Sequence, residues 1–404
     1  MTDSTDAEHE TNTQGTVTEV FVAFLKLGLT SFGGPIAHLG YFRTEFVERR
    51  RWLDDRGYSD LVALCQFLPG PASSQVGMAL GLGRAGWPGL LAAWAGFTLP
   101  SAIALILFAY GIAQCQGLAE SGWVQGLKIV AVAIVAQAVW GMAKALCPDR
   151  GRATLAILAA LLTLILPSVI GQVAAIAAAG LLGWWRLEIS QVPSSKAHFY
   201  PVSRKLGMAA LLLFAILLIG LPLAVLATGS SVVALVDGVY RAGALVFGGG
   251  HVVLPLLQAT VVPDGFVSNA DFLAGYGAAQ AVPGPLFTFT AYLGTVADGA
   301  LGGWTGGLVL LGAIFLPALL VLIAALPFWE ALRHRSGMQS AMAGVNAGVV
   351  GILLSALYDP VWISAIHSRS NFGLALAAFA LLVYGRVPPA LVVLLTAAAA
   401  WVLA

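Results

Sequence analysis

Apolar stretches of about 20 residues follow one another along almost the whole chain. A stretch of this length can cross the hydrocarbon core of a bilayer as a helix. The chain has 59% apolar and only 10% charged residues, which sets it apart from soluble proteins. The sequence therefore predicts an all-α polytopic membrane protein, with apolar segments at residues 17–42, 60–83, 87–114, 123–147, 153–167, 168–185, 207–228, 232–262, 272–297, 304–328, 338–358, 371–384 and 387–403.

Charge and motif content exclude several other classes. The formal net charge is +1 without a polybasic run, so no nucleic-acid partner is expected. Cys65, Cys115 and Cys147 lack the spacing of a zinc site, and their odd number does not suggest a disulfide framework. HExxH, GxSxG and nucleotide-binding motifs are absent, so neither an enzyme nor an ATP-driven pump is expected, and no cofactor is implied.

The second half of the chain repeats the first. LKLGLTSFGG at 25–34 aligns with YRAGALVFGG at 240–249, and QFLPGP at 66–71 aligns with QAVPGP at 280–285. Gly86-Trp87 followed by Pro100 likewise matches Gly303-Trp304 followed by Pro317. Agreement of several motifs at nearly constant spacing indicates an internal repeat. It predicts a tail at 1–16, a first membrane repeat at 17–185, a cytoplasmic linker with a connecting helix at 186–231, and a second repeat at 232–404.

The distribution of cations predicts that the two repeats are inverted. Loop 43–56 contains five Arg, whereas its counterpart 262–271 contains none. Arg84 corresponds in the same way to Asp298, and the cation-free loop 115–122 corresponds to a segment with Arg333 and Arg335. Because Lys and Arg favour cytoplasmic loops, the halves are expected to have opposite orientations, and the helix at 207–228 supplies the odd crossing that inversion needs. The tail, with four acids and no cation, is expected to be disordered and cytoplasmic.

Helix breakers divide two apolar stretches in the first half. Gly33-Gly34-Pro35 interrupts 17–42, and Pro69-Gly70-Pro71 interrupts 60–83. Broken backbone at membrane depth is tolerated only inside protein or along a cavity, so these stretches are expected to dip in and return beside a central site. Two alternatives stay open: both stretches could cross fully, with the Arg-rich loop outside, or the glycines could serve helix packing.

The central site is expected to bind an anion. Lys26 and Arg241 occupy equivalent repeat positions and together would suit a dianion, although a local pair between Arg241 and Asp237 is an equal alternative. Helices that begin after the PGP motifs would add N–H groups, and the nearby side chains would add hydrogen-bond donors or, alternatively, caps. The candidate binding residues are Lys26, Gly33, Gly34, Gln66, Pro69, Gly70, Pro71, Ser73, Gln75, Arg241, Gly248, Gly249, Gln280, Pro283, Gly284, Pro285 and Thr288, with Ser74 and Thr290 close by.

The motifs resemble the chromate ion transporter family in its long two-domain form. The resemblance rests on FGGP, the Arg-rich loop, CQFLPGP at 65–71, GAAQAVPGP at 277–285, and the Gly-Trp pairs before proline-containing helices, and it spans residues 17–403. It implies a bacterial inner-membrane protein that exports chromate and confers resistance to it. The second repeat has FGGG in place of FGGP, so its break is expected to be looser.

The transport mode stays open at the level of sequence. A secondary chromate transporter is the main prediction, and an anion channel or an exchanger of sulfate or another oxyanion is the alternative. The expected partners are the oxyanion and the lipid bilayer, and the sequence leaves open whether the chain forms a homodimer.

Overall fold

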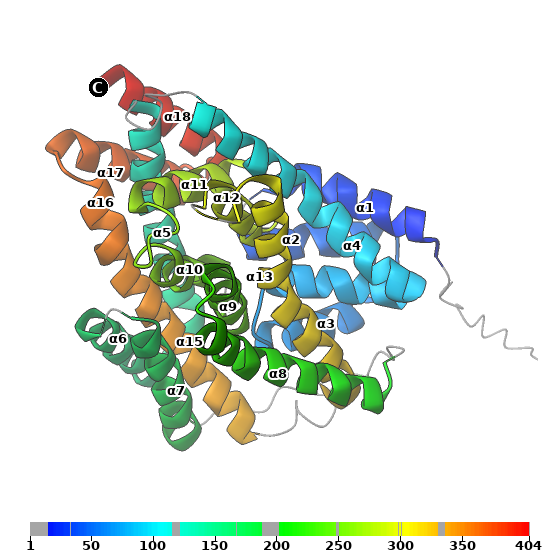
Figure 1. Ribbon diagram of the computed structural model, residues 1–404. Helices are drawn as coiled ribbons and strands as arrows, with labels where there is room; N and C mark the ends of the chain where they lie inside the picture. The colour runs from blue at the N-terminus through cyan, green and yellow to red at the C-terminus, as the bar shows by residue number, and fades with distance from the viewer. Residues whose placement is uncertain are drawn as a thin grey trace, which may run out of the picture.

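The apolar stretches fold into helices. The computed structural model describes residues 15–32, 34–114, 122–166, 168–187, 202–247, 250–297, 299, 301–329 and 336–403. Their regular structure is helical throughout, which confirms the predicted all-α class (Figure 1). The elements are α1 (Val17–Thr30), α2 (Gly34–Phe42), η1 (Arg43–Arg49), α3 (Asp55–Phe67), α4 (Ala72–Gln114), α5 (Gly122–Leu146), α6 (Arg150–Ile165), α7 (Val169–Arg186), α8 (Arg204–Thr228), α9 (Ser231–Ala244), η2 (Gly250–Val252), α10 (Val253–Val261), α11 (Asn269–Ala281), η3 (Leu286–Thr288), α12 (Phe289–Val296), α13 (Gly303–Ala325), η4 (Leu326–Phe328), α15 (Ser336–Ala356), η5 (Leu357–Trp362), α16 (Ile363–Ala365), α17 (Arg369–Val383) and α18 (Pro389–Leu403).

Side-chain caps fix where many of these helices begin. The Thr16 hydroxyl accepts the N–H of Glu19 at the start of α1, and the Asp54 carboxylate accepts the N–H of Gly57 at the start of α3. Such caps satisfy N–H groups of the first turn that have no partner within the helix. Serines do the same at the starts of α7, α8, α9, α11 and α17, where the caps are Ser168, Ser203, Ser230, Ser268 and Ser368.

The predicted breakers end helices inside the apolar stretches. Stretch 17–42 becomes α1 and α2, and the PGP segment at 69–71 separates α3 from α4. The equivalent breaks in the second half separate α9 from η2 and α11 from η3. Helix α4 breaks once more at Gly86, whose φ of +65° suits glycine, so the chain turns just before Trp87.

Five segments are long and apolar enough to cross a membrane among the described residues, namely 72–111, 122–146, 204–228, 303–328 and 337–365. The third of them, α8, connects the two predicted repeats. Only 6% of its most apolar window is buried within the protein, so most of this helix is left to contact lipid.

The two halves share their hydrophobic cores. Leu105 and Ile106 of α4 pack in a cluster built mainly from second-half residues. Leu322 and Ile323 of α13 pack in the cluster of first-half residues. Leu105 and Ile106 are separated from Leu322 and Ile323 by the same number of residues as Pro100 from Pro317, so the two pairs occupy equivalent repeat positions. Each half therefore contributes the equivalent helix to the core of the other.

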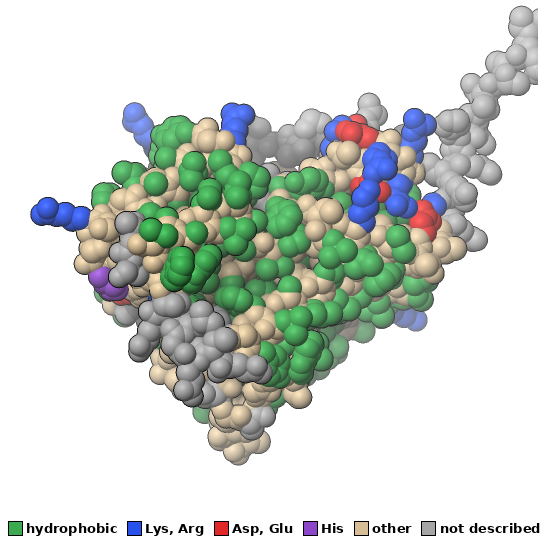
Figure 2. All heavy atoms as spheres, turned by 90° about the horizontal axis from the view of Figure 1, so that it is seen from above, with side chains coloured by type: hydrophobic (Ala, Val, Ile, Leu, Met, Phe, Trp, Pro, Cys, Tyr) green, Lys and Arg blue, Asp and Glu red, His purple; other side chains and the backbone are tan. Residues whose placement is uncertain are grey.

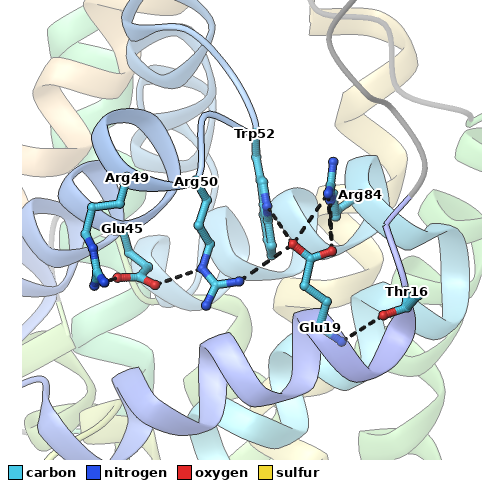
Figure 3. A network of polar contacts seen from close by, with 7 residues as sticks. All are labelled: Thr16, Glu19, Glu45, Arg49, Arg50, Trp52 and Arg84. Atoms are coloured by element: carbon cyan, nitrogen blue, oxygen red, sulfur yellow. Dashed lines mark hydrogen bonds and ion pairs between the residues drawn. The ribbon is translucent and has the colours of Figure 1, made fainter.

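A polar network joins three segments of the first half (Figure 3). Glu19 at the start of α1 forms ion pairs with Arg50, just after η1, at 3.6 Å and with Arg84, before the break in α4, at 3.2 Å. The Trp52 indole also donates to Glu19, at 3.2 Å. Arg50 also forms an ion pair with Glu45, at 2.8 Å. The start of α1, the segment after η1 and the end of the first part of α4 therefore meet at one place.

The molecular surface has one mixed-charge region on a largely apolar face (Figure 2). Basic and acidic side chains lie next to one another there, while hydrophobic side chains spread over most of the remaining face in that view. Exposed large apolar residues are the rule on helices in contact with lipid.

Some predicted features cannot be compared with the structure. Residues 1–14 of the tail, 188–201 of the linker, Asp298, Arg333 and Arg335 lie outside the described residues.

Candidate functional site

The two PGP loops have the same backbone conformation. Gly70 has a φ of +114° and Gly284 a φ of +105°, values that favour glycine because a side chain would clash with the backbone. Each loop follows a short helix, α3 or α11, and precedes the start of another, α4 or η3. The repeated sequence thus produces a repeated local structure.

Each PGP loop is hydrogen-bonded to the other half of the chain. The Gly70 N–H donates to the Val246 carbonyl at 2.7 Å, and the Gly284 N–H donates to the Ser31 carbonyl at 3.0 Å. Val246 and Ser31 precede the two glycine motifs at equivalent repeat positions. The two bonds are therefore reciprocal, and they bring four segments together at one junction.

Helices from the opposite half pack closely against these loops. A Cβ at Gly70 would lie 2.6 Å from the Ala318 Cβ, and one at Gly284 would lie 2.8 Å from the Ser101 Oγ. Ala318 and Ser101 directly follow the equivalent prolines of α13 and α4. Both glycines are needed for the close approach as well as for the backbone conformation.

The glycine motifs also contact one another. Gly34 has a φ of +77°, and a Cβ there would lie 3.7 Å from the His251 Nε2. A Cβ at Gly250 would lie 3.1 Å from the Pro35 Cγ. The FGGP segment of the first half therefore faces the FGGG segment of the second, although Gly33, Gly248 and Gly249 themselves lie outside the described residues.

The predicted donors after the PGP motifs are buried and largely act within their own segments. The Gln75 amide donates to the carbonyls of Pro69 at 2.9 Å and Ala318 at 3.2 Å. The hydroxyls of Thr288 and Thr290 donate to carbonyls three residues earlier, each at 2.8 Å. Of the described residues, Ser74 Oγ and Gln75 Oε1 are buried atoms without a hydrogen-bond partner. Local bonds to carbonyls thus occupy the two threonine hydroxyls, and Ser74 keeps a hydroxyl available.

The two repeat-equivalent glutamines have different surroundings. Gln66 is exposed, whereas Gln280 is partly buried. The Gln280 Nε2 is a buried amide nitrogen that has no acceptor among the described residues. Gln280 can therefore donate to an oxyanion, while Gln66 lies at the surface of the protein.

Lys26 and Arg241 are not brought together by any hydrogen bond or ion pair of the described residues. Lys26 is exposed on α1. Burial alone would raise the pKa of Glu45, but the hydrogen bond and charge of Arg50, with the charges of Arg49 and Lys26, lower it. The charge of Lys26 therefore favours the ionised form of Glu45 in the Arg-rich loop.

Arg241 forms an ion pair with the buried Asp237, which was the local alternative in the sequence. Both line a cavity of about 200 Å³ between α8, α9 and α10, together with Thr260 and Asp264. The Asp237 Oδ1 and Arg241 Nε have no further partner among the described residues. This cavity contains charge of both signs.

A larger cavity, of about 630 Å³, lies between α4, α5, α11 and α18. Its lining is apolar throughout and includes Phe108, Trp123 and Leu127. A dianion would lose its hydration there without gaining any hydrogen bond, so this cavity does not suit an oxyanion.

Two histidines that the sequence favours as structural residues lie near the junction. His38 is buried on α2 with its Nδ1 3.4 Å from the Ser73 Oγ. His251 lies in η2 with its Nδ1 2.8 Å from the Tyr276 hydroxyl. They do not occupy equivalent repeat positions and have no carboxylate close by in the sequence, and on these grounds the sequence favours a structural role for each. The sequence feature that could have indicated a role at the site is that each histidine follows a glycine motif within a few residues.

Comparison with known proteins gives a consistent result across both halves. The family model described as chromate transporter matches residues 18–184 and 233–401. The chain is 28% identical to a chromate transport protein of Pseudomonas aeruginosa over 352 residues, covering 86% of this chain and 82% of the relative. It is 26% identical to a chromate transport protein of Cupriavidus metallidurans over 354 residues, covering 85% and 82%. An uncharacterised transporter of Methanocaldococcus jannaschii is 25% identical over 344 residues, covering 83% and 82%. No solved structure matches the chain.

Proposed function

The chain belongs to the chromate transporter family, and on that premise we propose that it exports chromate from the cytoplasm across a bacterial inner membrane as a secondary transporter. Chromate is a tetrahedral dianion at neutral pH, and its export would confer resistance to it. The relatives named chromate transport proteins match over most of their own length, which supports the same substrate here.

The junction of the two PGP loops with the two glycine segments is the observation that carries the proposal. The N–H groups of Gly70 and Gly284 are already bonded and proline has none, so the PGP loops contribute the close approach of backbone that an unbroken helix does not allow. The starts of α4 and of η3 with α12 add N–H groups. The proposed binding groups are the starts of these helices, the glycine segments and Gln280. The hydrogens of Gln75 and Thr288 go to carbonyls, and the Ser73 hydroxyl lies against the His38 Nδ1. The contacts of Lys26, Gln66 and Arg241 lie elsewhere, so a binding role for these six residues stays a prediction.

We further propose an inverted repeat with re-entrant hairpins. Helix α1 has 14 residues and α3 has 13, which corresponds to about 20 Å each, less than the ~30 Å of the hydrocarbon core. The ion pairs of Glu19 with Arg50 and Arg84 support a return of both hairpins to the side from which they start. The reciprocal bonds of Gly70 and Gly284 support a pseudo-twofold relation between the halves.

Cysteine labelling tests this topology. In a background without Cys65, Cys115 and Cys147, a cysteine at the exposed Ser59 should be protected from an impermeant reagent in intact cells and should react in everted vesicles. A cysteine at the exposed Asp264, in the cation-free counterpart loop, should show the reverse pattern. Labelling of both positions from the same side would refute the inverted arrangement.

The membrane potential is sufficient to drive this export. With the cytoplasm negative, the outward movement of two negative charges releases about 4.6 kcal/mol at 100 mV, at roughly 2.3 kcal/mol for each charge. An electrogenic uniport therefore needs no coupling ion.

Uptake of radiolabelled chromate into everted membrane vesicles tests the function. An imposed inside-positive potential should drive accumulation above that of vesicles without the protein, and a pH gradient alone should not. Unlabelled sulfate as competitor reports on selectivity. Uptake that requires internal sulfate would favour an exchanger, and the absence of any protein-dependent chromate flux would contradict the proposal.

A further inference from the structure

Each half of the protein places one histidine beside the junction. His38 follows Gly34 by one turn of α2, and His251 directly follows Gly250. The two rings are held in the same way, because in each the Nδ1 is bonded to a hydroxyl, of Ser73 or of Tyr276. The His38 Nε2 is a buried atom without a hydrogen-bond partner, and the His251 Nε2 forms no hydrogen bond to another described residue.

His251 lies next to the glycine motif of the first half. Its Nε2 lies 3.7 Å from the position that a Cβ on Gly34 would occupy. Tyr276, which bonds the other ring nitrogen, is completely buried on α11. The imidazole therefore extends from a fixed hydroxyl toward the segment where the two halves meet.

His38 lies beside Phe97, the residue of α4 that faces the second PGP loop. Its ring packs edge to face against Phe97, with 5.2 Å between ring centroids. The Phe97 carbonyl in turn lies 3.2 Å from where a Cβ on Gly284 would be. His38 is 1% exposed, and its Nε2 is a buried polar atom without a partner. A buried nitrogen of this kind is costly unless a ligand or water satisfies it.

The Tyr276 hydroxyl determines which nitrogen of His251 carries the proton. A buried tyrosine hydroxyl needs an acceptor, and the Nδ1 of His251 is the partner that it has among the described residues. When the hydroxyl donates to Nδ1, the neutral imidazole carries its hydrogen on Nε2. Such an N–H is a donor that adds no fixed charge within the membrane.

We propose that His38 and His251 bind the transported oxyanion, each donating a hydrogen bond from Nε2–H, with Ser73 and Tyr276 as positioning residues that hold the rings. The inference rests on the proposed function and adds two binding residues to it. Two neutral donors from opposite halves suit a tetrahedral anion, which presents oxygens in several directions.

Transport kinetics in proteoliposomes test the pair. His38→Leu and His251→Leu should each raise the KM for chromate about tenfold or more, because an anion then loses one charge-assisted hydrogen bond. His38→Gln and His251→Gln, whose amides can donate from a similar position, should return the KM to within about threefold of wild type. Tyr276→Phe should raise the KM severalfold without reducing the amount of protein. The exposed His367, whose ring bonds the Ser364 carbonyl, provides the control: His367→Leu should behave as wild type.

The shift in thermal stability of the purified protein with added chromate or sulfate separates this inference from the proposed function. If an oxyanion stabilises the wild-type protein but is not transported, only the transport proposal is contradicted. The role of the histidines is then tested by whether the two Leu variants lose this stabilisation. An unchanged KM with a lower maximal rate or less protein in the Leu variants would assign the histidines to folding and overturn the inference. Failure of any oxyanion to stabilise or be transported by wild type would overturn both.

Discussion

Gly70→Ala and Gly284→Ala are each expected to remove most of the folded protein from the membrane and, with it, transport. A side chain at a φ of +114° or +105° introduces backbone strain of about 1–3 kcal/mol. The new Cβ would also lie 2.6 Å from the Ala318 Cβ in one case and 2.8 Å from the Ser101 Oγ in the other, and such overpacking costs about 1–3 kcal/mol more. These costs are large against the 5–15 kcal/mol that typically stabilises a protein.

Second-site changes make this prediction specific. Ala318→Gly removes the atom that collides with residue 70, so the pair Gly70→Ala with Ala318→Gly should recover part of the protein, as should Gly284→Ala with Ser101→Gly. Recovery should remain partial because the backbone strain persists. The matched control is Gly312→Ala in α13, where a Cβ meets nothing within 4 Å. Immunoblots of membranes measure the amounts, and wild-type levels of both single variants would contradict the close packing of the junction.

Arg241→Gln is expected to lower the stability of the protein by about 1–3 kcal/mol, because it leaves the Asp237 carboxylate without its cation. The Asp237 side chain is only 3% exposed, but the Arg241 side chain is 38% exposed and both line a cavity, so water replaces the guanidinium in part. The double variant Asp237→Asn with Arg241→Gln should be more stable than Arg241→Gln alone, since no charge then remains buried. Thermal unfolding of the purified variants in detergent measures the difference.

The same double variant separates folding from substrate binding. If Arg241 serves only its pair with Asp237, transport should return together with the amount of protein. If Arg241 also contacts the anion, protein should return without transport. Wild-type stability of the single Arg241→Gln variant would contradict the buried pair itself.

The sequence by itself determined the membrane class, the breaks and the repeat. Apolar stretches of bilayer length must form helices, because only a helix satisfies every backbone group of a single segment in lipid. The glycines and prolines at 33–35 and 69–71 then set where helices end, since they favour conformations or remove N–H groups that a helix cannot accommodate. The motifs were specific enough to identify the family, which the family model matches in both halves.

Only the tertiary structure decided which of these residues meet. Sequence spacing made Lys26 and Arg241 equivalent, yet Arg241 pairs with Asp237 one turn away, because a local partner satisfies a charge at less entropic cost than a distant one. Lys26 instead lies exposed on α1. The reciprocal bonds of Gly70 to Val246 and of Gly284 to Ser31 join residues that are far apart in the chain. His38 and His251 approach the junction from different repeat positions, so the internal alignment gave no sign of them. Periodicity and breakers act along a segment and can be recognised in it, whereas contacts between segments depend on how all the helices pack, and that information belongs to no single stretch of sequence.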